Sequence, residues 1–138
     1  MAHKRKPAGL AARRAISFEA EDPLAGPDQL DRLRRASRTL ADDRCDAAIV
    51  MSHNYSLDLA WLRYCAEREV GYVGLLGPAA RRDALLGELG APHAQRLHGR
   101  LHAPVGLDLG GHGGEAVALA IAAELQRHFS TRRNADHA

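Results

Sequence analysis

The chain lacks the long apolar run and the paired cysteines that mark several common classes of protein. Among its 138 residues, no apolar stretch approaches the roughly 18 residues that a membrane-spanning helix needs. The two cysteines, Cys45 and Cys65, are too far apart for the C-x-x-C spacing of zinc and redox motifs. We therefore expect no membrane segment and two buried, reduced thiols.

Aromatic residues are also scarce, at 4% of the chain. The first 14 residues carry five positive charges and no acid, but they contain no aromatic residue that could stack on nucleic-acid bases. We expect residues 1–26 to be a basic, flexible leader, and we expect no nucleic-acid interface. The eight histidines lack the tight spacing, backed by a carboxylate or cysteine, that marks metal ligands, so we predict no metal site.

The glycine-rich turn G-x-G-x-x-G, which holds the pyrophosphate in dinucleotide-binding folds, is absent. No Ser–His–Asp or Cys–His set can be assembled from the residue types either. The first absence argues against an NAD(P)-dependent oxidoreductase, and the second leaves no catalytic nucleophile that the sequence supports.

What the chain does contain is a strand-then-helix pattern that occurs twice. The apolar run Ala47–Met51 is followed by helical spacing from about Ser56 to Arg68, and Tyr72–Leu76 is followed by a helix from Pro78 to Leu89. Strands that alternate with helices indicate a parallel α/β sheet.

The remaining segments show weaker patterns. Residues 92–100 suggest a loose helical turn, and the glycine- and proline-rich ribbon 101–111 suggests no regular element. A last helix is predicted over 114–129, with an apolar stripe of Val117, Ala118, Ile121, Leu125 and Phe129, and residues 131–138 are predicted to be a disordered tail. Upstream, a short strand is predicted over 15–19 and a helix over 28–39.

Ligands of parallel sheets bind at the carboxyl ends of the strands. The candidate ligand-binding residues at these ends and in the ribbon are Ser52, His53, Asn54, Asp58, Gly74, Gly77, Arg81, Arg82, His102, Gly106 and Asp108. Simpler interpretations stay open. Asn54 or Ser56 can cap the first helix, with Asp58 complementing its dipole, and the two arginines can point into water. Asp108 can cap a turn.

Three motifs, MSHNYSLDLAWLR, GYVGLLG and LHAPVGLDLG, occur in this order over roughly residues 46–130. Together they resemble the C-terminal domain of the XdhC/CoxI family, whose members are accessory proteins of xanthine dehydrogenase and related molybdenum hydroxylases. The resemblance implies a truncated Rossmann-like domain over 27–130, with three layers and about three parallel strands flanked by helices.

The resemblance also implies a function. The chain is expected to be a cytoplasmic accessory protein that binds the molybdenum cofactor (molybdopterin) through the candidate residues and assists its sulfuration and insertion. This role is binding and handover without turnover, as a chaperone and not as an enzyme. Expected partners are a cysteine desulfurase and a molybdenum hydroxylase subunit. The open sheet edge left by the truncation predicts a homo-oligomer, or pairing with a chain that supplies the missing half. The alternatives are an NAD(P)-dependent Rossmann oxidoreductase and a degenerate fragment that acts only as an interaction module.

Overall fold

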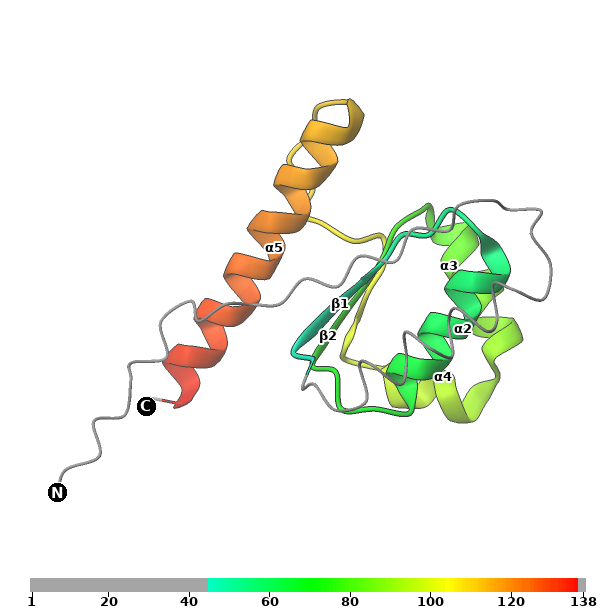
Figure 1. The fold of residues 1–138 in the computed structure, drawn as a ribbon. Helices are drawn as coiled ribbons and strands as arrows, with labels where there is room; N and C mark the ends of the chain where they lie inside the picture. The colour runs from blue at the N-terminus through cyan, green and yellow to red at the C-terminus, as the bar shows by residue number, and fades with distance from the viewer. Residues whose placement is uncertain (1–44, 137–138) are drawn as a thin grey trace, which may run out of the picture.

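The computed structural model describes residues 45–136, which form a parallel sheet with helices on both faces (Figure 1). Within the described residues the sheet has three strands, β1 (Ala47–Val50), β2 (Tyr72–Leu75) and β3 (Leu101–His102), in the order β1-β2-β3. The predicted three-layer α/β class is therefore confirmed. The predicted strand at 15–19 and helix at 28–39 lie outside the described residues.

In this part of the chain, three helices cover one face of the sheet: α2 (Tyr55–Ala66), α3 (Ala79–Leu89) and α4 (Ala91–Leu97). Alternate residues of a strand point to opposite faces, so Val73 and Leu75 enter this side and make the core with apolar residues of the helices. The largest of the helical core residues, Leu62, Leu85 and Leu97, are completely buried.

Both cysteines are free thiols, as predicted. Cys65 lies in the helical core, where burial raises the pKa of its thiol to about 12. Cys45 is only half-buried, and its Sγ lies 3.0 Å from the carbonyl oxygen of Ala47. The prediction of two buried thiols therefore holds fully only for Cys65.

Two segments are more regular than predicted. Residues 91–97 form helix α4, with a proline in its first turn, and Leu101 and His102 pair with β2 as strand β3. The C-terminal end of α4 and the approach to β3 are held by Arg100. Its guanidinium donates to the carbonyl oxygens of Val70 at 2.8 Å, Arg68 at 2.9 Å and Arg96. A strand of two residues is too short to show an alternating sequence pattern. Only its backbone pairing with β2 defines it as a strand.

The last helix, α5 (Gly113–Asp136), lies along the opposite face of the sheet (Figure 1). It continues through residues 131–136, which were predicted to be a disordered tail. No glycine or proline interrupts the segment after Phe129, and the Thr131 hydroxyl donates to the carbonyl oxygen of Arg127 at 2.9 Å.

Within residues 45–136, the contacts of α5 with the sheet are made by small and polar residues. Ala120 packs against Gly106, Glu124 accepts from the Tyr72 hydroxyl, and the His128 ring lies against that of Tyr72. In the predicted apolar stripe, Val117 is 39% exposed, whereas Ile121, Leu125 and Phe129 are partly buried.

Candidate functional site

The carboxyl ends of β1 and β2 lie next to the first turns of α2 and α3. Ligands of open parallel sheets bind at this edge, beside the N-termini of the helices that follow the strands. The structure brings seven of the eleven predicted residues to this part of the domain: Ser52, His53, Asn54, Asp58, Gly77, Arg81 and Arg82.

The N-terminus of α2 is satisfied by its own side chains. The Asn54 side-chain oxygen accepts from the backbone N–H of Leu57 at 3.0 Å, which makes Asn54 the N-cap. Asp58 lies in the first turn, where a negative charge complements the helix dipole. The simpler interpretation of Asn54, that of a helix cap, is therefore confirmed.

Asp58 is buried, with 1% of its surface exposed, and its carboxylate is fully engaged. One oxygen accepts from the backbone N–H of Ser52 at 3.1 Å and from the Ser52 hydroxyl. The other accepts from the Arg81 guanidinium at 2.9 Å. Asp58 therefore ties the end of β1 to the first turn of α3 and does not present a free carboxylate to a ligand.

The N-terminus of α3 has a different character. Pro78 precedes it without a side-chain cap, and its first turn holds no acidic residue but does hold Arg81 and Arg82. Gly77 enters the helix with φ +119°, a conformation that glycine adopts readily. Among residues 45–136, no side chain caps the first amides of α3, so their partial positive charge is available to an anion.

Arg82 is partly committed within the domain. Its guanidinium donates to the carbonyl oxygen of Ala103 at 2.9 Å and to the exposed carboxylate of Asp83 at 3.0 Å. Its side chain is still 33% exposed, so it retains donors that can reach a ligand at the end of α3.

His53 is exposed and has φ +57°, the only positive φ of a non-glycine residue within the described range. The left-handed region costs a non-glycine residue energy, and such residues cluster at binding turns. This turn directly follows β1, which makes His53 the residue at this edge whose backbone most favours a functional role.

The sequence pattern placed Gly74 with the residues at the strand ends, but the structure does not. Gly74 lies inside β2, opposite Ile49 and His102, and it is buried. A Cβ atom at this position would come within 2.5 Å of Val105 Cγ2 and 3.0 Å of Ile49 Cδ1. Gly74 is therefore required for packing, because it lets the segment after β3 fold back across the sheet.

Gly106 and Asp108, the predicted residues of the glycine- and proline-rich ribbon, also lie away from the carboxyl ends of β1 and β2. Gly106, with φ +102°, packs against α5, where an added Cβ would lie 3.1 Å from that of Ala120. Asp108 is exposed and makes no hydrogen bond or ion pair within residues 45–136.

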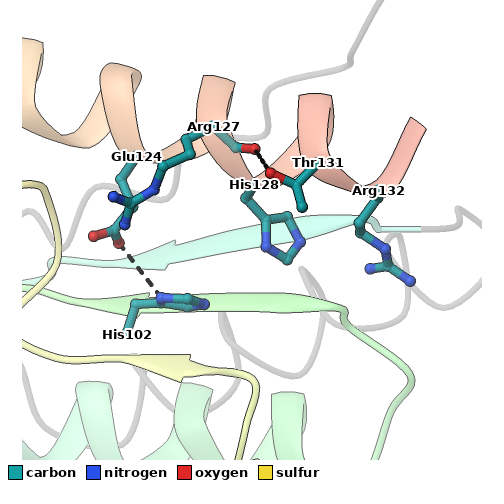
Figure 2. Close-up of a pocket in the computed structure, with 6 residues that line it drawn as sticks. All are labelled: His102, Glu124, Arg127, His128, Thr131 and Arg132. Atoms are coloured by element: carbon teal, nitrogen blue, oxygen red, sulfur yellow. Dashed lines mark hydrogen bonds and ion pairs between the residues drawn. The ribbon is translucent and has the colours of Figure 1, made fainter. Parts of the chain in front are cut away.

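His102 belongs to a polar cluster under α5. Its ring stacks on Tyr72 with centroids 4.2 Å apart. Figure 2 shows its contact with Glu124, in which Nδ1 lies 3.6 Å from a carboxylate oxygen. That oxygen also accepts from the Tyr72 hydroxyl and, at 3.4 Å, from the backbone N–H of Gly106. Glu124 was not among the predicted site residues. Ala116, Ala120 and Glu124 follow one another at four-residue spacing, and this is the signal that could have placed Glu124 on the inner face of the helix.

Burial and the neighbouring Glu124 carboxylate raise the pKa of Tyr72 well above the ordinary value of 10. A raised pKa in the folded state means that stability is complete below pH 10 and is lost as the pH rises further. We expect the free energy of unfolding of the wild-type protein, measured by urea titration, to fall above about pH 10. Tyr72→Phe is expected to be less stable at neutral pH by roughly 1–3 kcal/mol, because Glu124 loses a donor, and to show a shallower alkaline decline. An equally steep decline in the variant would contradict the assignment.

No group of three or more His, Cys, Asp or Glu side chains within residues 45–136 is arranged to hold a metal ion. Across the same residues, no helix is both long and apolar enough to cross a membrane.

Comparison with known proteins identifies the family. The family model of the XdhC Rossmann domain matches residues 5–125. The chain belongs to the XdhC family. The match begins at residue 5, so the XdhC domain extends upstream of residue 46, where the motif resemblance begins, into the segment predicted to be a leader.

Two relatives support this assignment. The XdhC domain is 34% identical over 80 residues to a protein of Bacillus subtilis (strain 168) described as a probable subunit of xanthine dehydrogenase. That match covers 58% of this chain and 22% of the relative. A crystal structure described as a xanthine dehydrogenase from Bacillus halodurans superimposes with a TM-score of 0.60 and 28% identity, covering 72% of this chain and 30% of that one. The chain therefore spans less than a third of the length of either relative.

Proposed function

We propose that this XdhC-family chain is a xanthine dehydrogenase accessory protein that binds the molybdenum cofactor at the carboxyl ends of β1 and β2. The names of both relatives refer to xanthine dehydrogenase. The observation that carries the binding site is the contrast between two neighbouring helices. Asn54 caps α2, whereas α3 begins without a side-chain cap and carries two arginines.

The residues at this edge fit an anionic cofactor. The phosphate of molybdopterin suits the first amides of α3, approached over Gly77, with Arg82 as a charged donor. Arg81 would act indirectly, because its guanidinium is bound to the buried Asp58. His53 would offer a ring N–H to a polar edge of the ligand. When bound, the cofactor supplies the molybdenum centre that the hydroxylase uses, and this chain would hold and release it.

The test is direct binding of molybdopterin to the purified chain, followed by pterin fluorescence. Arg82→Gln and His53→Ala are each expected to weaken binding about tenfold, the loss of one charge-assisted or buried hydrogen bond. Arg133→Gln, which removes an exposed arginine at the far end of α5, is the matched control and should leave affinity unchanged. Unchanged affinity in both strand-end variants would place the cofactor elsewhere. If the parent chain binds NAD(P) and not the pterin, the proposal is wrong.

The proposed partners are a molybdenum hydroxylase subunit, which would receive the cofactor, and a cysteine desulfurase, which would supply sulfur for its sulfuration. The names of the relatives support only the first of these. Co-purification of the chain with each candidate, with and without added cofactor, tests the two separately.

A further inference from the structure

A cavity of about 240 Å³ lies between the sheet and the C-terminal half of α5 (Figure 2). It is lined by His102, Glu124, Arg127, His128, Thr131 and Arg132. All but His102 come from α5, and Arg132 reaches Gly71, which precedes β2. The cavity therefore runs toward the amino ends of the strands, away from the edge where α3 begins.

We propose that this cavity is a second binding site, for the phosphate group of a small ligand. Among the described residues, the lining of the cavity includes two guanidinium groups, from Arg127 and Arg132, and one carboxylate, that of Glu124. That carboxylate is already engaged by Tyr72, Gly106 and His102. The Glu124 carboxylate in the lining of the cavity therefore already has partners, whereas the guanidinium groups of Arg127 and Arg132 make no ion pair within residues 45–136.

His128 provides an independent observation. Its Nε2 is shielded from solvent, and no group within the described part of the chain forms a hydrogen bond with it. A buried ring nitrogen without a partner is costly, and a bound acceptor oxygen would satisfy it. The Thr131 hydroxyl donates to the carbonyl oxygen of Arg127, so the donors left for a ligand are His128 and the two arginines.

The position of Arg132 depends on the glycine at position 71, which has no side chain. A Cβ atom at Gly71 would come within 2.5 Å of Arg132 Nη1, so the guanidinium lies against the bare backbone there. The cavity is smaller than the roughly 300 Å³ at which pockets for drug-sized molecules begin. It therefore suits inorganic phosphate or a short phosphate monoester better than a whole pterin cofactor.

The electrostatics of His128 agree with an anion in the cavity. Burial, Arg132 and His102 lower the pKa of His128, with Glu124 acting in the opposite direction. Tyr72 is the other titratable group against its ring. A bound anion would offset the repulsion from Arg132 and favour the protonated imidazole, so binding and protonation should strengthen each other.

The test is calorimetric titration of the full chain with inorganic phosphate, and with methyl phosphate to distinguish a free ion from an ester. Saturable binding is expected, weakened about tenfold by Arg132→Gln, which removes a positive charge, and by His128→Leu, which removes the ring donor. Gly71→Ala keeps every charge but displaces the Arg132 guanidinium, and it should also weaken binding. Arg133→Gln, an exposed arginine on the same helix outside the cavity, is the control.

Absence of saturable binding, or equal weakening by Arg133→Gln and Arg132→Gln, would overturn the proposal. A second readout does not depend on how a variant folds. In wild-type protein, sulfate, whose charge is constant across this pH range, should raise the NMR-measured pKa of His128. An unchanged His128 titration at saturating sulfate would also overturn it.

Discussion

Asp58→Ala is expected to lower the free energy of unfolding by roughly 2–4 kcal/mol, a large fraction of the stability of a small domain. The carboxylate is buried and accepts from the backbone and hydroxyl of Ser52 and from Arg81. Without it, the Ser52 N–H and the Arg81 guanidinium lose their partner where solvent access is restricted. The midpoint of urea unfolding at pH 7, with an unchanged m-value, measures the loss.

The matched control is Asp83→Ala. Asp83 also pairs with an arginine of the first turn of α3, at a similar 3.0 Å, but its side chain is 67% exposed. Exposed pairs contribute little, so this variant should unfold at nearly the wild-type urea concentration. Equal losses in the two variants would show that the Asp58 network is no stronger than a surface ion pair.

Gly74→Ala is expected to destabilise the domain by roughly 1–3 kcal/mol through overpacking of the sheet centre. The new methyl group would meet Val105, Ile49 and the ring of Tyr72 at 2.5, 3.0 and 3.2 Å. Because the neighbours belong to β1, β2 and the segment after β3, no single flexible side chain can relieve all three contacts. Thermal unfolding followed by circular dichroism gives the size of the effect.

A second substitution makes this test specific. Val105→Ala alone should cost stability, but in combination with Gly74→Ala it should recover part of the loss, because it removes the closest contact. Gly87→Ala, in the last turn of α3 at an exposed position with open space around it, should be neutral or slightly stabilising. If Gly74→Ala lowered cofactor affinity without affecting stability, Gly74 would be a binding residue after all, as its sequence context first suggested.

The elements with a strong sequence period were the predictable ones. β1 and β2 are short apolar runs bounded by turn residues, and the predicted Ala47–Met51 and Tyr72–Leu76 each exceed the observed strand by one residue. β3 was not predictable, because its two residues are held by backbone bonds to β2, which leave no trace in composition.

The candidate site could be located from the sequence but not resolved into roles. The strand-then-helix pattern placed His53 and Arg82 at the correct edge of the sheet. It could not show that the Asp58 carboxylate is paired with Arg81, because residues 23 positions apart come together only in the fold. The Glu124 cluster was missed for the same reason, because Tyr72 and Glu124 are separated by 52 positions.

The strand order has a consequence for how the two faces of this domain relate to each other. Both connections between successive strands run on the same side of the sheet, as parallel crossovers of uniform hand require (Figure 1). Chain that winds this way can cover the second face only from before its first strand or after its last, and α5 does so from after β3. The helices on the two faces therefore come from separate segments of the chain. Substitutions on the outer side of α5 can change the surface of one face and leave the packing of α2, α3 and α4 on the other face unchanged.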